Sequence, residues 1–247
     1  MATLLLRLAA PLQSWGSDSK FDIRRTGRDP TKSGVVGLLA AAKGYRRDDA
    51  GALEPLCALR MGVRIDQEGY LLRDFHTVWG YKRGAGNRIV YDKHTGRPVP
   101  AEKNTYVTTR YYLSDAVFLV GLEGDTALLS DLDAALKHPA FPLFLGRRAC
   151  PPTLPLTLGI RELSLEAALE AEAWQAKMGR MSDMLRIRVE TARGENAAAR
   201  TRDLPVDFNP EQRRFAFRGV REYWFRPGKV SDHDAMSALE EGDETCI

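Results

Sequence analysis

The 247 residues are enough for one large domain or two small ones, and 44% hydrophobic with 28% charged residues is typical of a globular protein. Residues 230–247 carry six acidic side chains and no Lys or Arg, whereas residues 1–229 carry 36 basic and 27 acidic side chains, a net charge of +9. A basic body points to a polyanionic partner such as nucleic acid. The acidic tail is predicted to be disordered.

Cysteine usage and the N-terminus exclude several classes of protein. Cys57, Cys150 and Cys246 are an odd, widely spaced set without a C-x-x-C pair, which argues against a disulfide framework or a structural zinc site. The first apolar run is too short to span a membrane, and Arg7 interrupts it where a signal peptide needs unbroken apolar residues. We expect a cytoplasmic protein.

The first third of the chain reads as a strand, a basic loop and a buried helix. A strand is predicted over 3–9, and the loop at 20–32 holds five Lys or Arg residues against two Asp. Pro30 disfavours an earlier helix start, so Thr31 or Ser33 is expected to cap an apolar helix over 33–43. A helix N-terminus beside arginines is a natural anion site. The alternative is a solvated basic loop that leads into a core helix.

The next segment predicts a short helix, a hairpin and a long insertion. A helix is expected over 53–58, and alternating strands at 59–66 and 70–79 around a Gln-Glu-Gly turn predict a β-hairpin. Residues 80–108 are rich in Gly, Pro and basic residues, with three tyrosines between the cations, a mixture suited to stacking on bases while pairing with phosphates. The alternative is a flexible surface insertion.

The remaining pattern completes a βαββαβ order. We predict a strand at 111–122, a helix from Asp125 or Thr126 to Lys137, and a strand at 154–160. Between the last two lies a glycine-arginine turn at 146–148, which could receive phosphate. The alternative is a tight turn with solvated arginines. Listed in order, the rest is a helix at 163–177, a strand at 184–190, a polar loop at 192–204 and a strand at 215–225.

The predicted fold class is α+β, with a modified ferredoxin-like, RRM-like βαββαβ domain. We assign this domain to 1–161 with an insertion at about 81–108, a small β-rich C-terminal extension to 162–229, and the acidic tail to 230–247. The βαββαβ order does not by itself give a function.

Collinear motifs identify a family. The chain resembles the CasD family, the subunit that holds the 5′ end of the guide RNA in the type I-E CRISPR surveillance complex Cascade. The motifs that carry the resemblance are L-R-L-A-A-P-L-Q-S-W-G at 6–16, R-x-T-G-R-D-P-T-K-S-G-V-V-G-L-L-A-A at 24–41, R-D-D at 47–49, L-R-D-F-H-T-V-W-G at 72–80, Y-L-S-D-A-x-F at 112–118, F-L-G-R-R-A-C-P at 144–151 and R-E-Y-W at 221–224.

The resemblance implies a RAMP-superfamily fold in which the insertion is a thumb and residues 146–148 are a glycine-rich loop. It implies binding to the 5′ handle of the CRISPR RNA and contact with the backbone subunit and the large subunit of the complex, with target DNA engaged only indirectly. No metal, cofactor or membrane is expected. The residues that we expect to bind RNA are Trp15, Arg24, Arg25, Arg28, Thr31, Lys32, Ser33, His76, Tyr81, Lys82, Arg83, Arg110, Gly146, Arg147 and Arg148.

A related subunit of another subtype implies an enzymatic alternative, the metal-independent cleavage of precursor RNA. That reaction needs a base, an acid and a cation, and His76, Tyr81 and Lys82 are close enough in sequence to be candidates, with His94 as a further one. The chain lacks a Walker-type loop, an H-x-x-x-H motif and a paired acidic metal motif, so nucleotide hydrolysis and metal-dependent cleavage have no residues. Binding without catalysis is the preferred interpretation.

Overall fold

The computed structural model describes residues 2–16, 19–20, 22–46, 49–176, 182–191, 197–208 and 214–227. The strands are β1 (Ala2–Ala9), β2 (Leu12–Gln13), β3 (Ser19–Lys20), β4 (Ile23–Arg24), β5 (Arg60–Gln67), β6 (Tyr70–Tyr81), β7 (Pro100–Ser114), β8 (Val117–Gly124), β9 (Thr157–Arg161), β10 (Leu185–Glu190), β11 (Ala199–Asp207) and β12 (Arg214–Phe225). The helices are α1 (Lys32–Lys43), α2 (Ala50–Ala58), the 3₁₀ turn η1 (Ala85–Asn87), α3 (Thr126–Lys137) and α4 (Leu165–Ala171). The fold is mixed α/β and mostly sheet.

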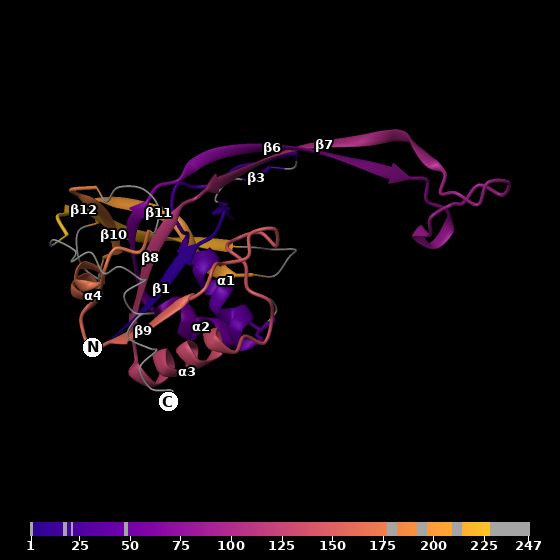
Figure 1. Cartoon of the computed structure of the whole chain (residues 1–247). Helices are drawn as coiled ribbons and strands as arrows, with labels where there is room; N and C mark the ends of the chain where they lie inside the picture. The colour runs from indigo at the N-terminus through magenta and orange to yellow at the C-terminus, as the bar shows by residue number, and fades with distance from the viewer. Residues whose placement is uncertain are drawn as a thin grey trace, which may run out of the picture.

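The main sheet has seven strands in the order β11-β12-β10-β5-β8-β1-β9, and all neighbours are antiparallel. β1 is buried along its whole length because helices cover both of its faces. Leu4, Leu6 and Leu8 pack in the cluster that contains α1 and α3, whereas Leu5 packs with Leu165 and other residues of α4. Figure 1 shows α1, α2 and α3 below the sheet and α4 at its other side.

The helix ends follow local sequence signals. Thr31 caps α1 with its side chain, which accepts a hydrogen bond from the backbone of Gly34, and Gly44 ends the helix with a φ of 76°. Asp125 caps α3 by accepting from the backbone of Leu128. The helices predicted around 33–43, 53–58 and 126–137 are therefore confirmed.

The predicted hairpin of 59–66 with 70–79 is wrong. β5 pairs with β8 and β10 in the main sheet, whereas β6 pairs with β7 in a second sheet. Gly69, with a φ of 71°, turns the chain between the two sheets. β5 is buried on both faces, whereas β6 is largely exposed. Two strands that are neighbours in sequence and similar in their alternation of residues therefore belong to different sheets.

β6 and β7 form a long two-stranded ribbon that projects from the body (Figure 1). The insertion predicted to be irregular over 80–108 is thus strand from Pro100 onward, and only 82–99 forms the tip. At the root of the ribbon β7 also pairs with β2 and, in parallel, with β4. The strand predicted over 111–122 is split at Asp115, which has a φ of 57°.

The C-terminal strands extend the main sheet rather than forming a sheet of their own. β10 pairs with β5, β12 pairs with β10, and β11 is the last strand. The loop predicted over 192–204 is wrong from Ala199 onward, because an edge strand tolerates the charged residues that made the segment look like a loop. α4 is shorter than the predicted 163–177, and the predicted disordered tail lies outside the described residues.

Candidate nucleic-acid interface

The register of the second sheet places basic side chains from two segments on one face of the ribbon. Arg24 of β4 lies opposite Arg110 of β7, and Arg110 lies opposite Asp74 of β6. Paired residues share a face, and residues two apart along a strand share it too, so His76 belongs to the same face. The His76 Nε2 atom is 2.7 Å from a carboxylate oxygen of Asp74. The Asp74 carboxylate is therefore already paired with His76. Among these four residues, the positive charges of Arg24 and Arg110 exceed the negative charge of Asp74.

Arg147 joins this face from the glycine-arginine turn. Its guanidinium donates to the backbone carbonyls of Tyr111, at 3.1 Å, and Arg24, at 2.9 Å. Its central carbon lies 4.8 Å from the centre of the Tyr112 ring, which is a cation–π distance. We call Arg24, Arg110 and Arg147 the arginine cluster. The structure thus brings together predicted residues from the basic loop, the ribbon and the turn, with His76 beside them.

Gly146 sets the position of Arg147. It has a φ of 87°, and a Cβ atom there would lie 1.7 Å from the carbonyl oxygen of Ser14. The turn is closed by backbone hydrogen bonds from Leu145 to Cys150 and from Cys150 to Arg147. Only glycine fits this close approach, so the turn packs against Ser14, directly after β2, and holds Arg147 over the ribbon root.

Further cations border the arginine cluster. Arg25 and Arg28 are exposed on the loop between β4 and α1, and Arg148 is exposed on the turn. Arg148, Gly146 and Ser33 line one groove of about 630 Å³ beside α1. The predicted residues of the turn and the start of α1 therefore border a common groove.

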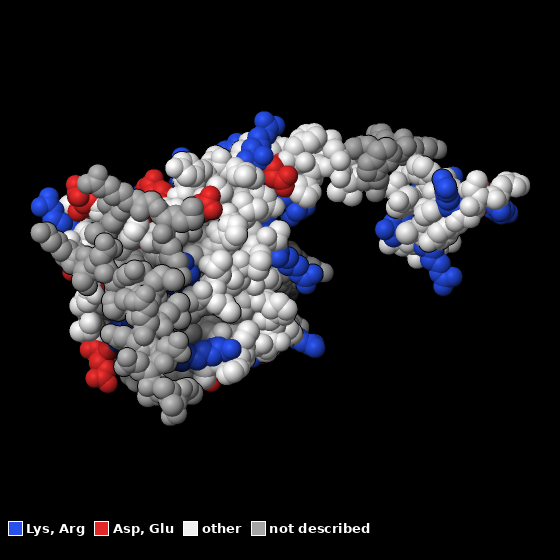
Figure 2. Space-filling model, in the orientation of Figure 1, with Lys and Arg blue, Asp and Glu red and all other residues white. Residues whose placement is uncertain are grey.

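A second basic surface lies at the ribbon tip, far from the first (Figures 1 and 2). The tip at 82–99 is folded back on itself by paired backbone hydrogen bonds between Val90 and its neighbours across the ribbon. Its Lys and Arg residues are Lys82, Arg83, Arg88, Lys93 and Arg97. The acidic residue there, Asp92, accepts hydrogen bonds from Thr95 and His94, and these bonds lower the pKa of its carboxyl group. Exposed Tyr81 and Tyr91 lie among these cations.

The structure does not offer Trp15 for base stacking. Trp15 is 1% exposed, and its ring nitrogen donates to the Gln13 side chain at 3.0 Å. A Cβ atom at Gly34 would lie 2.9 Å from the indole, so the ring is packed against the first turn of α1. Trp15 is therefore part of the core, and its contact with RNA stays a prediction.

Lys32 and the N-terminus of α1 are also already in use. The Lys32 ammonium is buried and bonds both carboxylate oxygens of Glu190, at 2.9 and 2.7 Å. Burial lowers the pKa of Lys32, although Glu190 opposes that shift. The backbone N–H of Lys32 donates to Asp203 at 2.8 Å, and Thr31 caps Gly34. An acidic side chain thus occupies the predicted anion site and Lys32 is already paired, while direct contacts of Lys32 and Thr31 with RNA stay a prediction.

The residues of the enzymatic alternative are not assembled. His76 and Lys82 are six residues apart along an extended ribbon, which is about 20 Å at roughly 3.3 Å per residue. Tyr81 is near Lys82, at the far end of β6. A single scissile phosphate cannot contact groups so far apart, so these three residues do not form one active site in this conformation.

Two residues of the candidate site were not predicted from the sequence. Asp74 holds His76, and Tyr112 lies under Arg147. The alternation of L-R-D-F-H placed Asp74 and His76 on one strand face, so the first pair had a usable signal. The second contact joins residues 35 positions apart in sequence and depends on the fold.

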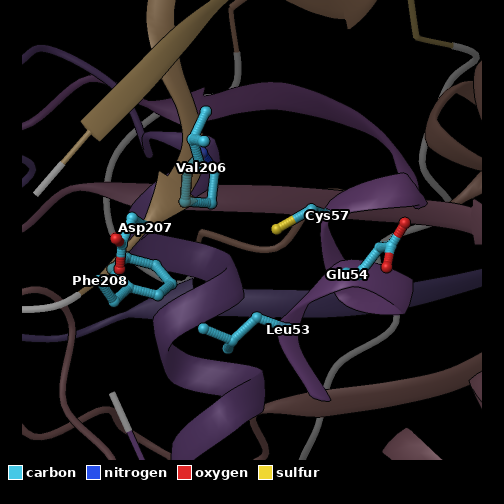
Figure 3. Close-up of a pocket in the computed structure, with 7 residues that line it drawn as sticks. Leu53, Glu54, Cys57, Val206, Asp207 and Phe208 are labelled. Carbon is cyan, nitrogen blue, oxygen red and sulfur yellow. The ribbon is translucent and has the colours of Figure 1, made fainter. Parts of the chain in front are cut away.

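A smaller cavity of about 330 Å³ lies between α2 and β11 (Figure 3). Leu53, Cys57, Val206 and Phe208 give it a mostly apolar wall. Burial raises the pKa of the Cys57 thiol, which disfavours its thiolate form. Cys57 and Cys150 are free thiols.

The described residues hold neither a metal-binding group nor a helix suited to a membrane. In the ranges that the structure describes, no group of three or more His, Cys, Asp or Glu residues is arranged to hold a metal ion. Within the same part of the chain, no helix has both the length and the apolar character that crossing a membrane requires.

Comparison with known proteins identifies the family. The family model described as "CRISPR-associated protein (Cas_Cas5)" matches residues 3–221. The protein "CRISPR system Cascade subunit CasD" of Escherichia coli (strain K12) is 38% identical over 173 residues, which cover 65% of this chain and 72% of the relative.

Solved structures agree over nearly the whole chain. A chain described as "Crystal structure of Cas protein" is 41% identical with a TM-score of 0.67, and the match covers 91% of this chain and 95% of that one. A chain of a "CRISPR RNA-guided surveillance complex" is 32% identical with a TM-score of 0.73, and the match covers 97% and 98% of the two chains. The chain belongs to the Cas5 family of CRISPR-associated proteins, as its motifs predicted.

Proposed function

We propose that this chain is a non-catalytic RNA-binding subunit of a Cascade-type CRISPR surveillance complex, that it holds the 5′ handle of the CRISPR RNA, and that it acts in the cytoplasm in antiviral defence. The observation that carries the proposal is the arginine cluster, where three segments distant in sequence converge on one face of the ribbon. Guanidinium groups that converge in this way are suited to the phosphates of one strand. The similarity to a Cascade subunit and to a surveillance-complex chain names the assembly.

The proposal includes a finer description of the fold. The strand order β9-β1-β8-β5 in a βαββαβ chain is that of a ferredoxin-like domain, and we assign the ribbon as its thumb. We keep 1–161 as this domain and 162–229 as an extension that builds onto its sheet edge.

We further propose that the ribbon face opposite the arginine cluster contacts the backbone subunit. Ile23 and Phe75 lie in one row across Thr109 on that face and are 50% and 61% exposed. Val107, 44% exposed, lies on the same face two residues from Thr109. An exposed apolar row opposite a basic face favours a protein on one side and RNA on the other.

The test of RNA binding uses a single-stranded RNA of the handle sequence and a salt titration. We expect Arg24→Ala and Arg110→Ala each to weaken binding about tenfold, since a hydrogen bond to a charged group contributes roughly 1.5–3 kcal/mol. Each lost phosphate contact should also lower the salt slope by roughly 0.7. Arg73→Ala is the matched control, because Arg73 is exposed on β6 and its register places it on the opposite face. Equal effects of all three substitutions would contradict the assignment of the faces.

The absence of catalysis is tested separately. We expect purified protein, incubated with labelled repeat RNA in EDTA, to bind the RNA without cutting it at a defined position. A general acid or base contributes roughly 10²–10⁴ in rate, so a genuine activity would be conspicuous. Site-specific cleavage that His76→Ala or Lys82→Ala abolishes would make this protein a processing nuclease and overturn the non-catalytic assignment.

A further inference from the structure

A hollow of about 720 Å³ lies where the main sheet meets the root of the ribbon. The end of β5, the start of β6 and the adjoining ends of β10 and β12 form its walls. Two aromatic side chains at this hollow are unusually exposed, Tyr70 at 76% and Trp224 at 58%, and Met184 beside them is 36% exposed. Aromatic residues with this exposure are enriched at protein interfaces.

The charges of the hollow are acidic although the rest of the body is basic. Glu68 and Asp115 are exposed and line it, and the single described Lys or Arg on its wall, Arg186, already bonds Glu68 at 3.2 Å. Arg186 also lies 3.8 Å from Glu222. An acidic, aromatic surface repels phosphate, so RNA is an unfavourable occupant here. The acidic segment 230–247 of the chain itself is unfavourable for the same reason.

The walls of the hollow are fixed before anything binds. Asp66 is held by Arg64, whose Nε atom is 2.7 Å from the carboxylate, and its carbonyl accepts the ring N–H of Trp174 at 3.0 Å. Gln67 donates to the carbonyl of Asp115 at 2.5 Å. A surface that is already ordered loses little conformational entropy on binding, which favours a docking role.

We propose that this hollow docks a neighbouring protein subunit, through a segment that presents an Arg or Lys side chain beside an apolar one. The apolar side chain would pack between Tyr70 and Trp224, and the cation would pair with Glu68 and Asp115. This contact is distinct from the one on the ribbon face. The inference rests on the proposed function, since the partner is a subunit of the same assembly.

The position of the hollow fits that arrangement. Tyr70 begins β6, and Asp74, beside the arginine cluster, lies four residues further along the strand, about 13 Å away. A subunit seated in the hollow would therefore border the RNA without competing for the arginines. One chain then connects RNA and two protein neighbours through three separate surfaces.

The experiment is photocrosslinking in the assembled complex. The chain, with p-benzoylphenylalanine in place of Tyr70, is co-expressed with the other subunits and the CRISPR RNA of its own complex, purified as the assembly and irradiated. We expect a crosslink to one protein subunit, with the crosslinked peptide containing Lys or Arg. A crosslink to RNA, or none from an assembly that forms normally, overturns the inference alone. A wild-type chain that fails to assemble with RNA removes the proposed function as well.

Substitutions test the chemistry of the contact. We expect Glu68→Lys combined with Trp224→Ala to reduce recovery of that subunit at least tenfold at physiological salt, with RNA affinity of the isolated chain unchanged. Glu54→Lys combined with Phe217→Ala is the control, because it changes an exposed acid on α2 and a 62%-exposed aromatic on β12 outside the hollow. Full recovery of the subunit with the first pair, or equal loss with both pairs, contradicts the docking role.

Discussion

At the residue scale, the glycine of the arginine turn is the position least open to change. Gly146 combines a left-handed φ with the close approach to the Ser14 carbonyl. We expect Gly146→Ala to lower the free energy of unfolding by at least about 2 kcal/mol, since a left-handed residue with a Cβ costs roughly 1–2 kcal/mol before any clash is counted. Urea denaturation measures the change.

The matched control for that prediction lies in α1. A Cβ atom at Gly37 would meet nothing within 4 Å, so Gly37→Ala should raise the free energy of unfolding by up to about 1 kcal/mol. If the two alanine variants behave alike, the close approach of the turn to Ser14 is not the reason for glycine at 146.

Glu166 at the start of α4 gives the protein an acid-sensitive contact. Hydrogen bonds from Arg60, the closer at 2.5 Å, lower the pKa of the Glu166 carboxyl group below its ordinary value. A carboxyl with a depressed folded pKa stabilises the fold above its unfolded pKa of about 4.3 and loses that contribution as pH falls through the folded value. We expect the free energy of unfolding to decline from about pH 5 downward.

The measurement is urea denaturation at several pH values between 7 and 3. Glu166→Gln should make the decline shallower, because the neutral side chain has no proton to gain. Glu162→Gln, at an exposed position four residues earlier, should leave the slope as it is. A wild-type slope in the Glu166→Gln variant would assign the acid sensitivity to other groups.

Residue roles were predictable where the signal was local. The caps at Thr31 and Asp125 lie within three residues of the backbone groups that they bind, and each was one of two residues predicted for its helix. The burial of Lys32 was not predicted, because its partners Glu190 and Asp203 lie 158 and 171 residues away in sequence. From the sequence alone, a lysine in a basic loop is interpreted as a phosphate ligand. Only the fold shows the carboxylates that it binds.

At the element scale, the ribbon tip is separable from the strands that carry it. Lys82 and Val99 are joined by a backbone hydrogen bond where the tip begins, so an Asn-Gly turn can replace 82–99. We expect this variant to keep the stability of the body and to lose salt-dependent RNA affinity. Five cations leave with the tip, so the salt slope should fall by at most about 3.5. An unchanged slope would remove the tip from the RNA interface.

Strand pairing was the part of the fold that periodicity could not decide. The alternation in β5 and β6 identified two strands, but neighbouring strands in sequence need not pair. β5 pairs at one edge with β8 and at the other with β10, and both partners come from distant parts of the chain. The loop predicted over 192–204 failed for a related reason, since edge strands carry the polar residues that loops do.

At the scale of the whole molecule, the C-terminal strands complete a sheet that the N-terminal part cannot close. Arg188 of β10 pairs with Asp29, Glu190 pairs with Lys32, and β10 covers the edge of β5. Removing one member of a buried ion pair costs roughly 3–5 kcal/mol. We expect a fragment of residues 1–183 to be unfolded or aggregated, and a fragment of 1–227 to unfold in one cooperative transition.

Circular dichroism during thermal unfolding distinguishes the two outcomes. The 1–227 fragment is the control, because it keeps every described strand and helix. A cooperative transition in 1–183 with a midpoint close to that of 1–227 would show that the first part of the chain is an independent folding unit.

The order of strand pairing has a consequence for synthesis on the ribosome. The ribbon pairs residues close in sequence, such as Tyr81 with Pro100, and a hairpin forms in roughly 1–10 μs. β5 must wait for β10, and β10 in turn waits for β12. At about 5–20 residues per second, the roughly 76 residues from Ser114 to Glu190, where β10 ends, take on the order of 4–15 seconds to emerge. During that interval we expect a nascent chain whose ribbon is complete while one edge of β5 is still open to chaperones.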